Sequence, residues 1–171
     1  MVDGTILCGF KRRCEDDQYN RLLELAIDVA TKVYKGRADE YGNLYIEHSK
    51  SIADSLTSTE YKIVAYLYGV CENTSIDLEE LDRLGFTYRI VNSVRILTQI
   101  DILTYEQYLN RLRYDYAARA VKIADLKYIT DTIRMFGAAK NDDADLRKYE
   151  KSIAFLESSE IMKPDFKIDG N

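Results

Sequence analysis

The sequence predicts an all-α protein. Apolar side chains recur at the three- and four-residue spacing of amphipathic helices along almost the whole chain. The 171 residues include a single proline, Pro164, which lies too near the C-terminus to interrupt these segments. Thr57, Asp77 and Thr104 are each followed three positions later by Glu or Gln, a pattern typical of helix starts. A chain of this length is typical of one domain, so we expect a compact single-domain bundle of about eight helices over residues 1–171.

The helices are assigned in order from the ends of each apolar stripe. Residues 17–35 form the first, because Leu22, Ala26 and Val29 share one face and Gly36 follows. The same reasoning predicts helices over residues 48–56, 60–71, 77–84, 87–97, 104–112, 116–136 and 142–156. Residues 37–47 show no helical stripe, so we expect a surface loop that brings His48 to the start of the second helix. Residues 132–157 form the closing helices, and we expect residues 158–171 to be a frayed tail.

Charge and composition exclude several classes of function. The net charge of -5 provides no broad positive field, so we expect no binding to nucleic acid. The longest apolar run, Ile63 to Cys71, is far shorter than the roughly 20 residues that span a bilayer, so we expect no membrane partner. Cys8, Cys14 and Cys71 form no C-x-x-C pair, and no signal peptide is evident, which favours a cytoplasmic protein with reduced thiols. The single histidine, His48, excludes a His-rich metal site.

His48 and Asp125 are the first candidates for chemistry. His48 begins a predicted helix between polar neighbours, where a hydrogen-bonded structural histidine and a ligand both fit the pattern. Asp125 lies in an apolar stretch of the long helix, where a carboxylate is costly unless it is paired or binds a cation. Lys122, three residues earlier, lies on the same helical face. A structural ion pair and a role in a pocket both remain open for Asp125.

Polar residues at the end of the core helix and two groups of cations form a second set. Glu72 and Asn73 could cap that helix or enter a cleft. The cations could line a pocket for an anionic ligand or form a solvated face: Lys11, Arg12, Arg13, Lys32, Lys35 and Arg37.

Four stretches of the chain carry a family resemblance. Residues 26–37 (AIDVATKVYKGR) and 42–48 (GNLYIEH) are similar to A-x3-A-x3-H-x-G-Q and G-x-P-Y-I-x-H. Residues 65–74 (AYLYGVCENT) are similar to A-x-L-H-D-V-x-E-D-T, and residues 78–86 lead to a V-x-x-L-T-like segment. Residues 105–109 and 121–131 (VKIADLKYITD) are similar to Y-x-x-Y and V-K-x-A-D-L-x-x-N-x-x-D. In this order they resemble the HD-domain hydrolases of the Rel/SpoT type, especially the small alarmone hydrolases, with a recognisable core over residues 21–131.

The resemblance implies a divalent metal, usually manganese, that activates water to remove the 3′-pyrophosphate of guanosine tetraphosphate or pentaphosphate. His48 and Asp125 match two of the four metal ligands, but Tyr68 and Gly69 stand where the His-Asp doublet would be. Glu72 matches the first residue of the catalytic acidic pair. Four other positions depart from the pattern. Tyr34 replaces an early His, Leu44 replaces a Pro, Asn73 replaces the second acidic residue and Ile129 replaces an Asn. The expected ligand-binding residues are Lys35, Arg37, Tyr45 and Lys122.

One His and one carboxylate leave most positions around a hard dication to water, so we expect no cofactor. The leading hypothesis is a catalytically degenerate HD-domain protein whose remnant pocket binds a guanosine polyphosphate, a similar nucleotide or nothing. In this reading the Tyr68 phenol fills the vacated space and donates a hydrogen bond to Asp125 or His48.

Two alternatives stay open. One is an active, manganese-dependent pyrophosphohydrolase with a rearranged site of His48, Glu72, Asp125 and Asp131. The other is an interaction module for a protein partner or a second copy of the chain, which would dock on the former active face at Tyr34, Tyr45, Tyr66 and Tyr68.

Overall fold

The computed structural model describes the backbone of residues 4–38, 42, 44–98, 102–136 and 142–158, and the side chains of these residues except 4–15, 136 and 142. Within these residues the structure has eight helices and, besides them, one isolated bridge between Ala38 and Leu44. The predicted tail lies outside the described residues. The helices are α1 (Gly4–Val33), α2 (Tyr45–Asp54), α3 (Thr59–Asn73), α4 (Leu78–Arg83), α5 (Tyr88–Leu97), α6 (Tyr105–Leu112), α7 (Tyr116–Phe136) and α8 (Asp142–Ser158).

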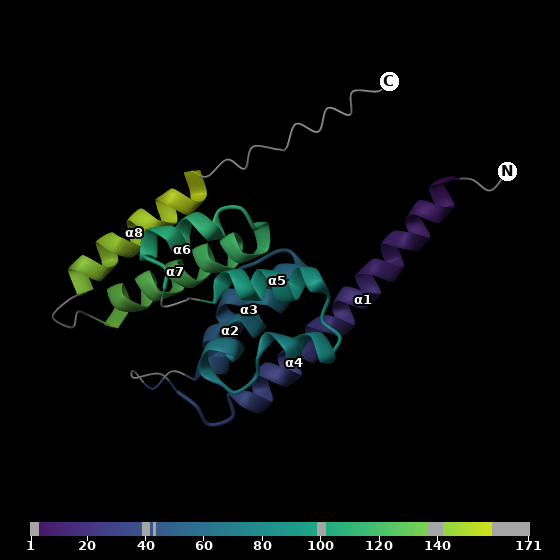
Figure 1. Cartoon of the computed structure of the whole chain (residues 1–171), viewed down its shortest axis with the longest axis horizontal. Helices are drawn as coiled ribbons and strands as arrows, with labels where there is room; N and C mark the ends of the chain where they lie inside the picture. The colour runs from purple at the N-terminus through teal and green to yellow at the C-terminus, as the bar shows by residue number, and fades with distance from the viewer. Residues whose placement is uncertain (1–3, 39–41, 43, 99–101, 137–141, 159–171) are drawn as a thin grey trace, which may run out of the picture.

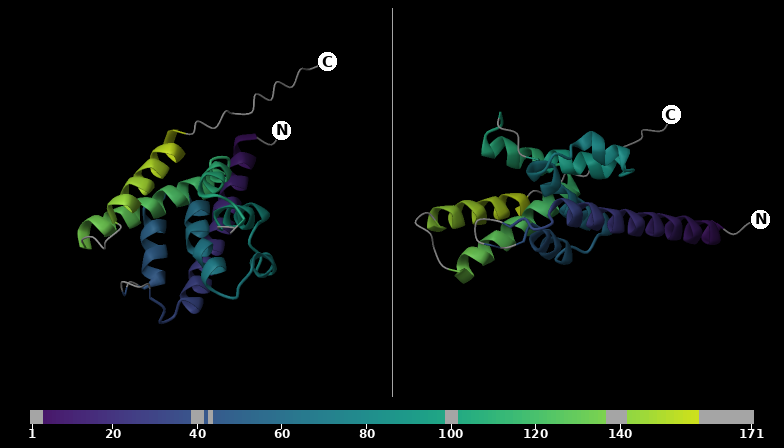
Figure 2. Two further views of the ribbon diagram at one scale, coloured as in Figure 1. Left: turned by 60° about the vertical axis from the view of Figure 1, so that its left-hand side comes forward. Right: turned by 90° about the horizontal axis from the view of Figure 1, so that it is seen from below.

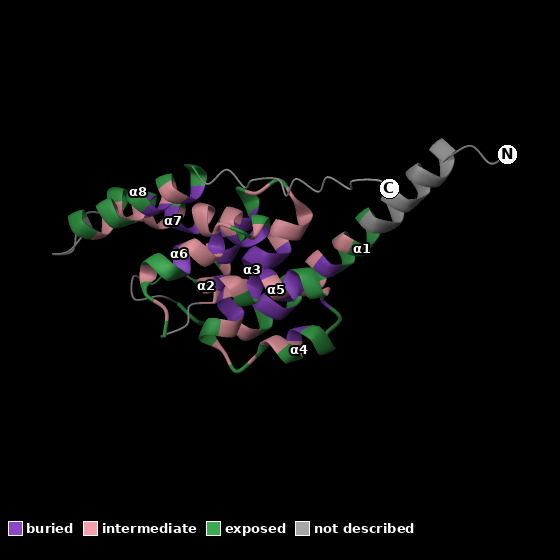
Figure 3. Cartoon of the chain, turned by 45° about the horizontal axis from the view of Figure 1, so that its top comes forward, coloured by how far each residue is buried: buried purple, intermediate pink, exposed green. Residues whose placement is uncertain are grey.

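Helix α3 is the centre of the bundle. It packs against α1, α2, α5 and α7, which surround it (Figure 1). Its sequence is apolar on nearly every side, and residues 63–67 and 69–70 are buried. A helix that is hydrophobic all round is stable in water only when its neighbours cover it, so α3 fixes where α2 and α7 lie. Figure 3 shows the resulting concentration of buried residues around α3 and α5.

The outer helices cover the core less completely. Helix α8 packs mainly against α7, and the views agree that these two helices lie side by side (Figure 2). Helix α1 is long, and its N-terminal part extends beyond the rest of the bundle (Figures 1 and 2). In the described part of the chain, no helix is long and apolar enough to cross a bilayer.

Helix ends show where local sequence signals were correct and where they were wrong. Asp77 accepts a hydrogen bond from the backbone of Glu80, and Thr104 and Gln107 form a complete capping box at the start of α6. The capping box expected at Thr57 is wrong, because α3 begins after Ser58, whose side chain makes no capping bond. Gly36 follows α1 with φ of 72°, a left-handed conformation that glycine adopts readily. It therefore marks the end of the helix, as the sequence predicted.

Two further boundaries differ from the sequence expectation. Helix α1 begins at Gly4 rather than at residue 17. Helix α2 begins at Tyr45 rather than at His48, so the expected loop is shorter and His48 lies in the first turn of the helix. The backbone N–H of His48 bonds the carbonyl of Leu44 at 3.2 Å, which holds this first turn in place.

Candidate functional site

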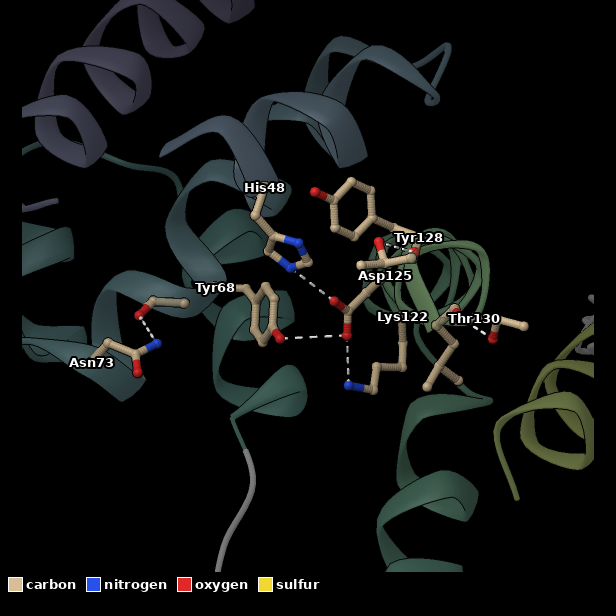
Figure 4. Close-up of polar contacts among 10 residues, drawn as sticks. His48, Tyr68, Asn73, Lys122, Asp125, Tyr128 and Thr130 are labelled. Carbon is tan, nitrogen blue, oxygen red and sulfur yellow. Dashed lines mark hydrogen bonds and ion pairs between the residues drawn. The ribbon is translucent and has the colours of Figure 1, made fainter. Parts of the chain in front are cut away.

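The carboxylate of Asp125 is the centre of a buried polar cluster. Asp125 is 1% exposed, and three side chains converge on its two oxygens (Figure 4). His48 Nε2 lies 3.1 Å from Oδ1, Lys122 Nζ donates to Oδ2 at 2.7 Å, and the Tyr68 hydroxyl donates to Oδ2 at 3.4 Å. The ion pair with Lys122, one of the two open readings of Asp125, is confirmed, and it lies inside a larger polar cluster.

Three helices position these side chains. His48 comes from the first turn of α2, Tyr68 from the middle of α3, and Lys122 and Asp125 from one face of α7. The contacts of α3 and α7 with each other and with α2 bring these faces together. Lys122 and Asp125 are three residues apart, so the helical repeat alone places them together. The position of Tyr68 beside Asp125 agrees with the hydrogen bond expected from the sequence.

The electrostatics of the cluster are balanced internally. Burial alone would raise the pKa of Asp125, but the Lys122 ammonium and the His48 hydrogen bond lower it to about 2. Burial would lower the pKa of Lys122, yet the Asp125 carboxylate raises it well above its usual range. Burial and the nearby carboxylate raise the pKa of Tyr68, which keeps its phenol protonated at neutral pH. One carboxylate thus faces one ammonium, with a neutral phenol beside them.

A second feature lies one residue further along α3, at Gly69. The Tyr34 hydroxyl lies 2.7 Å from the point where a Cβ at position 69 would be, which is closer than real Cβ contacts allow. Tyr34 is 2% exposed, and its ring stacks on Tyr45 with centroids 5.5 Å apart. Asn73 Nδ2 donates to the carbonyl of Gly69 at 2.9 Å. The space of a side chain at position 69 is therefore filled by Tyr34.

The remaining ligand-binding candidates are spread around this second feature. Arg37 is exposed and donates to the backbone carbonyl of Asn73 at the end of α3. Tyr45 is partly buried against Tyr34, whereas Lys35 is exposed. Of the four predicted residues, only Lys122 contacts Asp125.

The two acidic candidates, Glu72 and Asp131, lie in different places relative to the Asp125 cluster. Glu72 is exposed in the last turn of α3, close enough for its charge to raise the pKa of both Tyr34 and Tyr68. Asp131 lies on another side of α7, in a groove shared with α8, where it pairs with Arg134 at 3.5 Å. Asp131 therefore lies away from the other residues of the rearranged site.

Tyr128 is a neighbour of the cluster that the sequence reasoning missed. Its ring packs edge-on against His48, with centroids 4.7 Å apart and an interplanar angle of 75°. Tyr128 follows Asp125 by three residues, so the helical repeat could have identified it. The tyrosine-rich docking face is not present as expected, because Tyr34 and Tyr66 are both buried.

The donor set does not fit the divalent metal that the resemblance implies. Among the side chains that the structure describes, no three from His, Cys, Asp and Glu come together to hold an ion. Manganese prefers about six oxygen or imidazole ligands. Asp125 is the only carboxylate in contact with His48 in the described contacts, and its oxygens already accept from three protein groups.

Comparison with known proteins shows the fold of the chain. No family model matches the chain, and no curated protein sequence matches it. A solved structure of a metazoan ortholog of SpoT, which hydrolyzes ppGpp and plays a role in starvation responses, matches with a TM-score of 0.66 at 15% sequence identity. The match covers 82% of this chain and 88% of that one. The chain therefore shares the all-α fold of this SpoT ortholog, as its motifs predicted.

Proposed function

We propose that this chain is a catalytically degenerate HD-domain hydrolase-like protein. On this proposal the scaffold remains, metal-dependent hydrolysis is lost, and the ligand of the remnant site is a guanosine polyphosphate or a similar nucleotide that is bound without turnover. The ppGpp hydrolysis of the structural relative supports this ligand class. The scattered cysteines support a cytoplasmic location as part of the same proposal.

The observation that carries the proposal is that three protein donors already contact the Asp125 carboxylate. Its oxygens accept from His48, Lys122 and Tyr68, and the Lys122 ammonium supplies the compensating charge. A metal ion at Oδ2 would compete with the ammonium at 2.7 Å and with the phenol, and the positive charge of the ammonium would repel it. Without a bound ion, nothing lowers the pKa of a water molecule to make it nucleophilic at neutral pH.

The Tyr34–Gly69 contact supports the proposal independently. In the family pattern position 69 is a metal ligand, and a carboxylate there needs at least a Cβ. The Tyr34 hydroxyl occupies that space. A carboxylate ligand at position 69 is therefore excluded by packing, as well as being absent from the sequence.

The test is metal content and turnover of the purified full-length protein. After expression in manganese-supplemented medium, elemental analysis should find far less than stoichiometric manganese, and guanosine tetraphosphate should remain intact when manganese is added. Asp125→Asn is the control, because it removes the charge of the central carboxylate. Stoichiometric manganese with hydrolysis that Asp125→Asn abolishes would overturn the proposal and favour a rearranged active site.

A further inference from the structure

A groove of about 540 Å³ lies between α6 and α8. Tyr105 and Leu109 line it from α6, and Arg147, Lys148, Lys151 and Phe155 line it from α8. The Asp125 cluster lies elsewhere, among α2, α3 and α7. The groove is within the usual range of small-molecule sites, roughly 300–1,000 Å³.

Among the residues that the structure describes, no carboxylate pairs with the cations of this groove. Arg147, Lys148 and Lys151 are exposed and lie within about one turn of α8, and none forms an ion pair with any residue that the structure describes. Glu106, also on the groove, is exposed and leaves a local excess of positive charge. This excess stands out in a chain whose net charge is -5.

The groove on the other side of α8, shared with α7, provides an internal comparison. There Lys127 pairs with Glu157 at 2.7 Å, and Arg134 pairs with Glu150 at 2.7 Å. Helix α8 thus directs Glu150 and Glu157 to cations of α7, and Arg147, Lys148 and Lys151 to the groove with α6. A groove lined by cations without carboxylate partners attracts an anionic ligand.

One wall of the groove is held in place from within. The Tyr105 hydroxyl lies 3.0 Å from the buried Ser152 Oγ, and Ser152 donates to the carbonyl of Lys148 at 2.8 Å. The Lys148 ammonium lies over the Tyr105 ring, 4.2 Å from its centroid. These contacts fix the ring and the ammonium before a ligand arrives, which lowers the ordering cost of binding.

We propose that the α6–α8 groove binds an organic polyphosphate such as a nucleoside diphosphate. Three cations within one helical turn match the compact charge of linked phosphates better than the spaced carboxylates of a peptide. The phosphates contact Arg147, Lys148 and Lys151, and the nucleoside lies against Leu109 and Phe155. This site is separate from the remnant site and does not depend on the proposed function.

Calorimetric titration of the full-length protein with guanosine diphosphate, inorganic pyrophosphate and guanosine tests this site. Guanosine diphosphate should bind more tightly than pyrophosphate or guanosine, because it engages both the cations and the apolar wall. Lys148→Gln/Lys151→Gln should weaken its binding at least about tenfold, since charge-assisted contacts are lost. Lys127→Gln/Arg134→Gln, which removes the same charge from paired cations, should change the affinity less than about twofold.

Several outcomes would overturn the site. Failure of guanosine diphosphate to bind, or equal weakening in the two double variants, rejects it. Tighter binding of a polyglutamate peptide than of guanosine diphosphate assigns the groove to acidic proteins instead. Binding that is lost in His48→Gln and kept in Lys148→Gln/Lys151→Gln places the nucleotide at the remnant site, so the groove proposal fails while the proposed function stands.

Discussion

The Tyr34 hydroxyl occupies the space that a side chain at Gly69 would need. Glycine inside a helix costs roughly 0.5–1 kcal/mol relative to alanine, so its presence in the centre of α3 needs a reason. The reason is steric, because the hydroxyl lies 2.7 Å from the position of a Cβ, while the next ring atom, Cζ, is 3.8 Å away. Tyr34 therefore restricts position 69 to glycine, and Gly69 leaves the space that the Tyr34 hydroxyl fills.

Gly69→Ala should destabilise the protein by about 1–2 kcal/mol, since it forces an overlap in a packed core. In a Tyr34→Phe background the same change should be neutral or slightly stabilising, because the overlap is gone and alanine favours the helix. Chemical denaturation of the four proteins in this double-mutant cycle measures the difference. An equal effect of Gly69→Ala in both backgrounds would show that the hydroxyl is not the obstacle.

The sequence could predict contacts within a helix, but it could not predict this pair. Lys122 and Asp125 are together because they share one face of α7, and Tyr128 follows from the same repeat. Tyr34 directly follows α1 and Gly69 lies in α3, and only the packing of these helices brings the two residues together. The family comparison indicated that both positions had changed, without showing that one fills the space of the other.

Helix boundaries depend on signals of different reliability. The bounds predicted for α7, residues 116–136, agree with the structure because an uninterrupted apolar stripe defines them. Helix α2 begins three residues before its predicted start at His48. In the sequence Tyr45 and Ile46 resemble the end of a loop, but in the structure both pack against the core. Thr57 and Thr104 carry the same local pattern, yet only Thr104 caps a helix.

These two threonines provide a matched test of capping. Thr104→Ala should destabilise the protein by about 1 kcal/mol, because it removes the oxygen that accepts from the backbone of Gln107. Thr57→Ala should change stability by less than about 0.5 kcal/mol, since exposed Thr57 makes no capping bond. Thermal denaturation followed by circular dichroism compares them. Similar losses in both variants would place a cap at Thr57 after all.

The whole molecule keeps its fold because the core requires only a pattern of apolar side chains, whereas the site requires particular atoms. At 15% identity to its structural relative, the chain still places α3 among four neighbouring helices. The site rests on a few positions, and Tyr68 and Gly69 stand where the resemblance would place two metal ligands. The fold could therefore be predicted from the apolar periodicity and the order of the motifs. The contacts among the site side chains could be known only from the structure.

The central position of α3 also predicts how stability is distributed across the molecule. Backbone amides of α3 should exchange with solvent only through global unfolding, because side chains such as Leu67 are fully buried on all sides of the helix. Helix α4 has six residues and buries only Leu81 among them, so it should open locally and exchange faster by at least about tenfold. Hydrogen–deuterium exchange with mass spectrometry measures both segments under native conditions, with α7 as a second buried reference. Equal protection of α4 and α3 would mean that the bundle opens only as a whole.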